Sequence, residues 1–548
     1  MQTGYTGYVD RSEWWWTVVV SVSFVLVTFV PYIIVAVLGG GQANLQMMGA
    51  LHDPIEAAAQ IARMQQGADG QILLSFLYTP QAQPSVLIHP LYVLLGQLVR
   101  FSQLSAVIIF HLMRFFVSIF MYMTIYHLGA HIWVKVRARR MFFIMASAVA
   151  GLGWLVAILF GWDQSLYPLD LTLPQAFPLY ASAANVHYPL AIACIALLVA
   201  VIMPALRPGE DSEPSADNSG LMVFLTSVIL AFVYPVALIP LGLAYGATVA
   251  INWYIQRKIT RREFYWGLWI LVPALPIIIY YLLTIMSNDF VTNWLNQRWD
   301  TLPPGWMIPV SLGIPLVIAL PGLIRAVRRF EPDGDRFMLI WLVAMLVSLY
   351  VMPPLNQDLL LGLLIPIGYF ATRATEDFWF EYIRRIYRPR IYVVMFPLLV
   401  LSHLLWIFLP IYPIIANWNI ANHSFLNREY GATLLWLDQN AGEDSLILAG
   451  PQVSLWIPAW SGLPVVYGHP DESYNAEEAS ANVINWYQAD DASDPICTDL
   501  IDRYQVDYVL QGVLERGIGA NACLENLQAV LIIDESITIY ATDYSLPE

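Results

Sequence analysis

Two carboxylates three residues apart are the sharpest candidates for chemistry in this sequence. Asp53 and Glu56 precede an alanine-rich stretch that is expected to be helical from Glu56 to Gln66. At a spacing of i and i+3, both side chains share one helix face or stand at the start of the helix. A carboxylate held there can act as a general base on an acceptor hydroxyl or amine. Alternatively, both acids simply favour the positive end of the helix dipole, where Pro54 also suits the first turn.

A few other polar groups are candidates for binding an anionic substrate. His111 and Arg114 lie on one face inside a long apolar run, where a charged side chain is costly and suggests function; Arg114 can equally pair with a carboxylate or carbonyl of the helix bundle. Arg298, flanked by tryptophans, is either a phosphate partner or an interfacial arginine. Further candidates are expected on the same side of the membrane as Glu56: Asn185, His187, Asn356, Gln357 and Asp358.

Two aromatic-rich turns near the C-terminus are candidates for covering a bound acceptor or sugar. Trp460 lies in a WIPAWSG segment, and His469 follows shortly in YGHP. A turn that presents a histidine and aromatic rings can pack on a sugar, although a histidine on a turn is often merely exposed. The sequence has no phosphate-cradling glycine loop and no HExxH, CxxC or GxSxG pattern, and no metal-ligand set is predicted.

The elements that must position these residues are membrane helices. The 548 residues are 58% hydrophobic and only 12% charged, which is too apolar for a soluble protein of this length. A transmembrane helix needs about 20 apolar residues. We therefore expect an α-helical polytopic membrane protein with about eleven spans, at 15–38, 104–127, 141–161, 188–206, 220–234, 236–254, 264–286, 307–326, 336–352, 359–374 and 391–415.

Positive charge predicts the orientation of these spans. If all eleven runs cross, every cluster of lysine and arginine falls on one face, which is expected to be cytoplasmic. The sequence therefore predicts a multi-pass plasma-membrane protein with its N-terminus inside and its C-terminus outside. The clusters are Lys135, Arg137, Arg139 and Arg140; Arg257, Lys258, Arg261 and Arg262; Arg325, Arg328, Arg329 and Arg336; and Arg384, Arg385, Arg388 and Arg390.

Two segments outside the spans are long enough to fold. Residues 39–103 form a large outer loop, in which the apolar stretch from Leu87 to Val99 is too short to span and is expected to lie in the interface. From about 416 to 548 short strand-like and helical stretches alternate, which predicts a small extracytoplasmic α/β domain after a membrane domain of residues 1–415. This tail has a net charge of −17, which argues against nucleic acid as a partner.

The three cysteines are divided between these regions. Cys194 lies within a span and is expected to pack there. Cys497 and Cys523 lie in the tail, in a predicted oxidising compartment, so we expect a disulfide between them; two free buried thiols are the alternative.

The order of parts resembles the GT-C superfamily of polyprenyl-phosphate-sugar glycosyltransferases, which includes the protein mannosyltransferase and aminoarabinose transferase families. Within it, the chain is similar to an uncharacterised bacterial branch. The resemblance rests on short matches over nearly the whole chain: Pro54-Ile55-Glu56, Met64-Gln65-Gln66-Gly67, Leu94-Leu95-Gly96, His111-Leu112-Met113-Arg114, Asn185-Val186-His187, Gly362-Leu363-Leu364-Ile365-Pro366, Leu435-Trp436-Leu437-Asp438-Gln439-Asn440, Ile457-Pro458-Ala459-Trp460 and Tyr504-Gln505-Val506-Asp507-Tyr508-Val509.

This resemblance implies an inverting glycosyltransferase with a lipid-phosphate leaving group and an early-loop carboxylate as base. By position that base is Glu56, with Asp53 second. The chain departs from the pattern twice: it has Gln60 where relatives tend to carry tyrosine, and Gln357-Asp358-Leu359 where they carry Gln-Arg-Arg. Arg298 or Arg114 would then have to hold the phosphate.

The implied partners are a polyprenyl-phosphate-linked sugar, membrane lipids and a cell-envelope acceptor on the outer face. No redox or nucleotide cofactor is needed; a divalent cation, Mg²⁺ or Mn²⁺, is compatible, because some relatives use one to hold carboxylates and phosphate together. Two alternatives remain open. One is a non-catalytic relative that binds lipid or acts as a scaffold subunit. The other is a transporter of a lipid or polymer, which would place charged groups through the depth of several spans.

Overall fold

The computed structural model describes residues 7–38, 45–161, 166–206, 218–257, 260–297, 302–332, 334–352, 355, 357–412, 423–533 and 536–545. It divides the chain into two compact units. The first comprises Met1–Pro31, Met113–Tyr281 and Trp299–Pro410, and the second comprises Tyr32–Leu112, Leu282–Arg298 and Ile411–Glu548.

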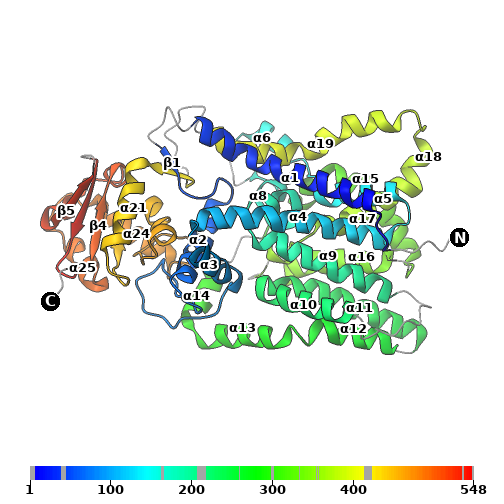
Figure 1. The fold of residues 1–548 in the computed structure, drawn as a ribbon, viewed down its shortest axis with the longest axis horizontal. Helices are drawn as coiled ribbons and strands as arrows, with labels where there is room; N and C mark the ends of the chain where they lie inside the picture. The colour runs from blue at the N-terminus through cyan, green and yellow to red at the C-terminus, as the bar shows by residue number, and fades with distance from the viewer. Residues whose placement is uncertain are drawn as a thin grey trace. The chain divides into compact units, whose positions relative to one another are not determined.

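The first unit is helical in the part that the structure describes, and most of its long helices run side by side (Figure 1). Helices α1, α4 and α13 begin in one unit and end in the other. The longer helices are α1 (Arg11–Leu38), α4 (Ala106–Ile132), α5 (Val136–Ser147), α6 (Gly153–Phe160), α9 (His187–Ala205), α10 (Asn218–Val233), α11 (Leu238–Gln256), α12 (Arg261–Leu271), α13 (Leu275–Ser287), α15 (Met307–Arg329), α16 (Asp335–Val351), α17 (Leu364–Ala374) and α19 (Arg388–Phe408).

Shorter helical turns connect these long helices. They are α7 (Leu169–Thr172), η2 (Pro174–Ala176), α8 (Pro178–Ala183), η3 (Pro235–Ala237), η5 (Gln357–Leu360), η6 (Thr375–Trp379, a π-helical turn), α18 (Phe380–Tyr382) and η7 (Leu409–Ile411).

Six helices of the described chain are long and apolar enough to cross a membrane. The pair Glu263–Leu271 and Leu275–Ser287, which is bent by 44°, passes the same test together and would be a seventh span if it crosses as one. The chain is therefore a multi-pass membrane protein, as predicted, but the count of eleven is not confirmed. The six are Arg11–Val37, Ala106–Ile132, His187–Ala205, Pro235–Ile255, Met307–Arg329 and Arg388–Ile411.

The run at 141–161, which we expected to be one span, is broken between α5 and α6. The break frees backbone N–H groups, and the buried carboxylate of Asp170 accepts hydrogen bonds from Gly151 N (3.1 Å) and Gly153 N (3.0 Å). Opposite it, Gly313 kinks α15 with a φ of 39° and approaches Gly151 so closely that a side chain there would collide with its backbone. These contacts within the first unit therefore stabilise the break between α5 and α6.

The second unit joins the large loop to the tail. The loop contributes α2 (Pro54–Ala68) and α3 (Pro90–Ser102), and α14 (Asp289–Gln297) lies in the same unit. Strand β1 (Leu45–Met47) of the loop pairs antiparallel with β2 (Phe425–Asn427) of the tail. In this compact unit the loop therefore packs with the tail and with α14, and the predicted division into a membrane domain of residues 1–415 and a tail domain stays a prediction.

The tail contains the small α/β arrangement that the sequence predicts. A four-stranded sheet has the order β3-β4-β6-β5, in which only β3 and β4 are parallel. Its core includes Trp486, Tyr487, Val509 and Leu448, all fully buried. The elements are α21 (Arg428–Asn440), β3 (Ile447–Leu448), α22 (Pro451–Ser454), α23 (Ile457–Ser461), α24 (Ala476–Gln488), α25 (Pro495–Tyr504), β4 (Tyr508–Gln511), α26 (Val513–Arg516), η8 (Ala522–Asn526), β5 (Gln528–Ile533) and β6 (Ile537–Ala541).

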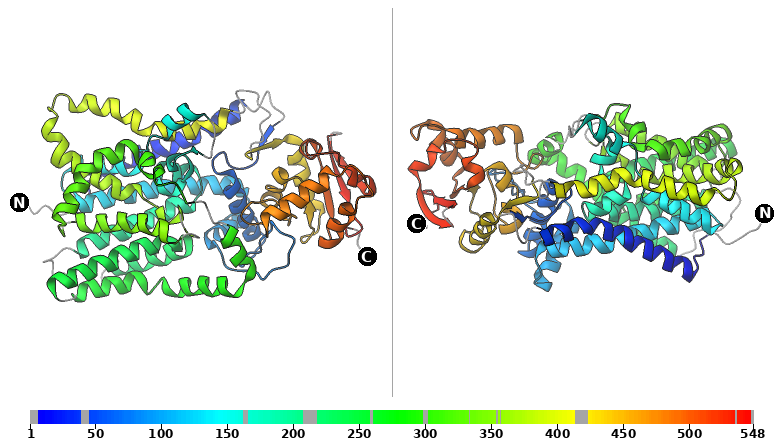
Figure 2. Two further views of the ribbon diagram at one scale, coloured as in Figure 1. Left: turned by 180° about the vertical axis from the view of Figure 1, so that it is seen from behind. Right: turned by 90° about the horizontal axis from the view of Figure 1, so that it is seen from above.

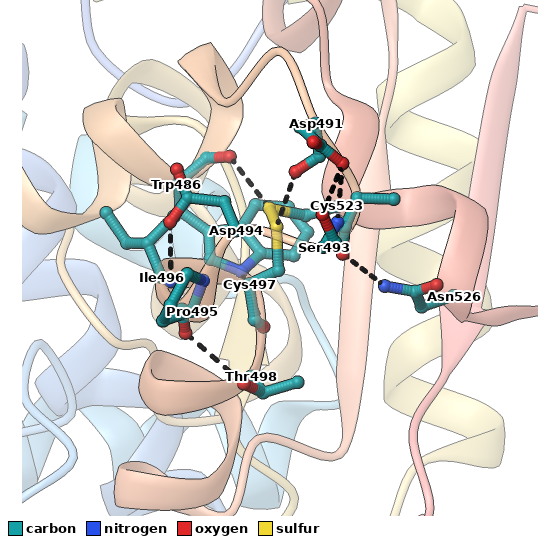
Figure 3. Close-up of a disulfide and its surroundings, with 11 residues drawn as sticks. Trp486, Asp491, Ser493, Asp494, Pro495, Ile496, Cys497, Thr498, Cys523 and Asn526 are labelled. Atoms are coloured by element: carbon teal, nitrogen blue, oxygen red, sulfur yellow. Dashed lines mark hydrogen bonds between the residues drawn. A yellow bond between two sulfur atoms is a disulfide. The ribbon is translucent and has the colours of Figure 1, made fainter.

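A disulfide between Cys497 and Cys523 closes this core (Figure 3). It joins the first turn of α25 to η8, and both cysteines are buried beside Trp486, whose indole N–H donates to the carbonyl of Cys497. The third cysteine, Cys194, is a buried free thiol in α9.

Candidate functional site

The two candidate carboxylates stand at the start of α2. Asp53 is the N-cap residue, with a left-handed backbone (φ 51°, ψ 53°) that aspartate tolerates better than most residues. Pro54 occupies the first helical position, and Glu56 lies in the first turn. Both carboxylates are partly exposed, and Glu56 Oε1 accepts a hydrogen bond from the side-chain amide of Gln60. The helix therefore offers two accessible carboxylates at its positive end.

The backbone just before Asp53 is held by aromatic and histidine side chains. His111 Nε2 bonds the carbonyl of Gly49 at 2.8 Å, and Tyr32 Oη accepts from Leu51 N at 3.1 Å. The rings of Tyr32 and His111 pack edge to face, with centroids 4.8 Å apart. Trp460 donates its indole N–H to the carbonyl of Met48 at 2.8 Å.

The structure thus brings His111 and Trp460, two residues singled out in the sequence, to the segment that carries Asp53 and Glu56. His111 Nε2 and Trp460 Nε1 both bind backbone carbonyls, so their visible role is to position the carboxylate segment. Contact with a substrate stays a prediction.

The remaining length of α2 is packed against its own unit. It crosses α3 where Gly67 and Gly96 meet backbone to backbone, so that an added side chain at either would collide. Arg63 forms a buried ion pair with Glu472 of the tail. Beside this pair, burial raises the pKa of Tyr78 well above its ordinary value, and the nearby Glu472 carboxylate adds to the effect.

His469 is buried rather than presented at a surface. Its side chain is 1% exposed, and Nδ1 accepts hydrogen bonds from the N–H groups of Asp471 and Glu472. Its ring packs on Tyr78, at 5.3 Å between centroids. The histidine therefore shapes the turn that carries Glu472, and a direct role as a cover over an acceptor stays a prediction.

A second polar cluster lies within the first unit. Asp358 Oδ1 accepts hydrogen bonds from Tyr234 Oη (2.6 Å) and from the Gln175 side-chain amide (3.3 Å). The Tyr234 ring stacks on His187, with centroids 6.1 Å apart and planes 15° apart. Asn185 is fully buried two residues before His187.

Three of the residues singled out in the sequence, Asn185, His187 and Asp358, thus belong to one region. Gln357 lies beside Asp358 in η5, whereas Asn356 lies outside the described residues. Sequence reasoning missed Tyr234 and Gln175. In the sequence, Tyr234 stands out only as the junction between two apolar runs, and no pattern points to Gln175.

Of the two candidate phosphate-binding arginines, the structure describes only Arg114. Arg114 is fully buried, donates to the carbonyl of Ala183 and lies 4.4 Å from the ring centroid of Phe29. These contacts match the structural alternative considered for it, and phosphate binding stays a prediction. Arg298 lies outside the described residues.

Among the described residues, no group of three or more His, Cys, Asp or Glu side chains is arranged to hold a metal ion. Any cation at the start of α2 would depend on the two carboxylates of Asp53 and Glu56 and on oxygen atoms supplied by a substrate.

Comparisons with known proteins identify the fold. No family model matches the sequence, and no curated protein matches it significantly. Solved structures do match. ArnT from Cupriavidus metallidurans, bound to undecaprenyl phosphate, is 13% identical with a TM-score of 0.52, and the match covers 98% of this chain and 100% of that one.

An oligosaccharyltransferase from Archaeoglobus fulgidus, tethered to an acceptor peptide, is 11% identical with a TM-score of 0.52. The match covers 97% of this chain and 75% of that one. A complex of AglB from the same organism with an inhibitory peptide and a dolichol-phosphate is 12% identical, with a TM-score of 0.50 over 98% and 75% of the two chains. These matches show the fold: this chain shares the architecture of ArnT and of the archaeal oligosaccharyltransferase, and the resemblance noted in the sequence is confirmed at that level.

Proposed function

We propose that this protein is an inverting glycosyltransferase that moves a sugar from a polyprenyl-phosphate donor to an acceptor on the outer face of the membrane. The observation that carries the proposal is the pair of accessible carboxylates, Asp53 and Glu56, at the positive end of α2 in a GT-C fold. Two of the similar solved structures hold undecaprenyl phosphate or dolichol-phosphate, which supports a lipid-phosphate donor.

Glu56 is the general base in this proposal. Its carboxylate takes the proton of the acceptor hydroxyl or amine as the acceptor oxygen or nitrogen forms a bond to the anomeric carbon. The bond from that carbon to the lipid phosphate breaks on the opposite face, and the phosphate leaves with the bonding electrons, which inverts the configuration. Gln60 orients Glu56 through its side-chain amide.

Asp53 is the second carboxylate at the same helix end. If the reaction uses Mg²⁺, Asp53 and Glu56 would supply the one or two carboxylate ligands that this ion commonly takes in company with substrate phosphate. Such an ion would screen charge on the donor phosphate, and the addition of EDTA to a transfer assay tests whether one is needed.

The test is sugar transfer by purified full-length protein from a panel of polyprenyl-phosphate sugars. Glu56→Gln keeps the shape of the side chain and an acceptor for Gln60, but removes its basicity. Transfer should fall by about 10²–10⁴-fold, equivalent to roughly 3–5 kcal/mol of barrier.

Asp53→Asn is the matched control, because asparagine also tolerates the left-handed backbone at this position. If Asp53 serves mainly as charge at the helix end, its replacement should cost only about 0.3–1 kcal/mol of stability and little activity. Loss of transfer in Asp53→Asn with full activity in Glu56→Gln would assign the base to the other carboxylate.

One observation favours a second candidate, a non-catalytic lipid-binding relative. Asp358 places a carboxylate in η5 where the resembling chains carry arginine, and it is engaged with Tyr234 and Gln175. Such a protein would bind a polyprenyl phosphate without turning over any donor. Binding of undecaprenyl phosphate with no transfer from the whole donor panel would favour this candidate.

A further inference from the structure

A large apolar groove in the first unit has no role in the proposed transfer. It has a volume of about 840 Å³, within the range of roughly 300–1,000 Å³ that is typical of ligand pockets. Its walls come from α5, α15, η6, α18 and α19, which lie in one region of the bundle (Figures 1 and 2). Apolar side chains dominate the walls, including Met141, Ile144, Ile318, Met395 and Phe396.

Three arginines line the same groove, and their partners differ. Arg137 forms a bidentate ion pair with Glu376, at 2.9 and 2.7 Å, which neutralises its charge. Arg388 stacks on Phe380, 4.3 Å from the ring centroid, and donates to backbone carbonyls. Arg140 stacks on Trp16 at 4.7 Å, with its Nε buried.

The groove therefore carries excess positive charge. In the described part of the chain, neither Arg140 nor Arg388 has a carboxylate within ion-pair distance. Their guanidinium groups are held in place by aromatic rings, so little conformational freedom would be lost when they bind an anion. A ligand for this site must combine an anionic group with an apolar chain.

The apolar wall also lacks protein cover. Val317 is 57% exposed, and Tyr392 and Phe396 of α19 are exposed as well. A soluble anion would use the arginines and leave these side chains without a partner. A neutral lipid would cover the wall and leave the arginines without a counter-charge.

We propose that this groove binds an anionic glycerophospholipid. The headgroup phosphate lies against Arg140 and Arg388, and an acyl chain covers the wall formed by Val317, Ile318 and Met395. Both arginines belong to the clusters predicted to face the cytoplasm, where basic pockets between membrane helices bind anionic headgroups. The lipid thus comes from the inner leaflet, and the proposal does not depend on the transfer activity.

The experiment is native mass spectrometry of the purified full-length protein, titrated separately with phosphatidylglycerol, phosphatidylcholine and undecaprenyl phosphate. Wild-type protein should bind one phosphatidylglycerol more tightly than phosphatidylcholine. Arg140→Gln and Arg388→Gln should each weaken that binding by roughly tenfold, the loss expected for one charge-assisted contact. Val317→Trp should weaken it by filling the exposed wall.

Arg328→Gln is the matched control, because Arg328 is an exposed arginine of α15 that does not line the groove. It should bind phosphatidylglycerol as the wild type does. Equal loss in Arg328→Gln, unchanged binding in Arg140→Gln and Arg388→Gln, or unchanged binding in Val317→Trp would each overturn the proposal. If undecaprenyl phosphate binds more tightly than phosphatidylglycerol, and this binding is lost in the same variants, the proposal is also overturned, because the groove would then bind a different lipid.

Discussion

Glu515 is a buried carboxylate that hydrogen-bonds three segments of the tail to one another. Its fully buried carboxylate accepts hydrogen bonds from Gly450 N (3.1 Å), Gly512 N (2.9 Å) and Tyr430 Oη (2.6 Å). These donors come from three separate segments, so one side chain connects α21, the end of β3 and the start of α26. Burial raises the pKa of Glu515 above its ordinary value, and the hydrogen bonds only partly oppose this.

A raised pKa makes the stability of the tail depend on pH. Between the ordinary pKa of 4.5 and the higher folded value, the folded tail holds a proton that the unfolded chain has lost, so stability falls as pH rises through that window. Glu515→Gln should remove this dependence. It should also cost about 1–3 kcal/mol at all pH values, because an amide cannot accept from all three donors.

Hydrogen exchange of peptides from β4, corrected for intrinsic exchange rates and measured from pH 4 to 8, gives the opening free energy. Glu478→Gln, at an exposed position of α24, is the control and should leave the profile unchanged. An identical pH profile in wild type and Glu515→Gln would refute the assignment of this titration to Glu515.

At the scale of elements, a buried ion pair joins α2 to the tail. The side chains of Arg63 and Glu472 are 6% and 7% exposed, and Glu472 follows the turn that His469 shapes. The same helix carries Asp53 and Glu56 at its start. The ion pair therefore influences where the candidate base lies, although neither partner belongs to the proposed chemistry.

Removal of one partner of this ion pair should strongly lower the stability of the second unit. Arg63→Met leaves the Glu472 carboxylate buried without its counter-charge, which typically costs about 3–5 kcal/mol. Arg63→Met with Glu472→Met removes both charges and should recover most of that loss. Hydrogen exchange of α2 peptides measures both; a double variant that is less stable than the single one would contradict this account.

The local elements of the second unit were largely predictable from the sequence. The helix expected from Glu56 to Gln66 is Pro54–Ala68 in the structure, and the tail folds as the alternating short strands and helices that the sequence predicts. Their signals are local: proline at a helix start, alanine within, and short β-branched runs. The break at 141–161 was missed because hydropathy does not register that the carboxylate of Asp170 replaces the lost helical hydrogen bonds.

The candidate site was predictable in its residue types but not in its contacts. Asp53 and Glu56 were visible through spacing and resemblance. The burial of His469 against Tyr78 was not, because the two residues are almost four hundred positions apart and neither sits in a pattern that points to the other. Long-range packing of this kind leaves no trace in local periodicity.

At the scale of the whole molecule, the membrane orientation rests on the one-sided clusters of arginine and lysine. We expect the tail to lie outside and the segment around α18 inside. A membrane-impermeant maleimide applied to intact cells should label Glu478→Cys but not Glu381→Cys, both of which are exposed positions. The native thiols should contribute little, because Cys194 is buried and the other two cysteines form a disulfide.

Permeabilised cells provide the control for this measurement, since both positions should then react. Labelling of Glu381→Cys but not Glu478→Cys in intact cells would reverse the orientation. It would also place the proposed acceptor on the opposite side of the membrane.

The pairing of β1 with β2 has a consequence for how the protein is made. The segment before Asp53 pairs with β2 and with Trp460, and Arg63 of α2 pairs with Glu472. These partners are synthesised much later, since Arg63 and Glu472 are 409 residues apart. At translation rates of about 5–20 residues per second, α2 would leave the ribosome roughly 20–80 s before its anchors exist. Until then the nascent loop lacks the partners that complete its packing in the second unit. A ribosome that stops before residue 472 would therefore yield a chain in which α2 can still pack on α3 but lacks its buried ion pair with the tail.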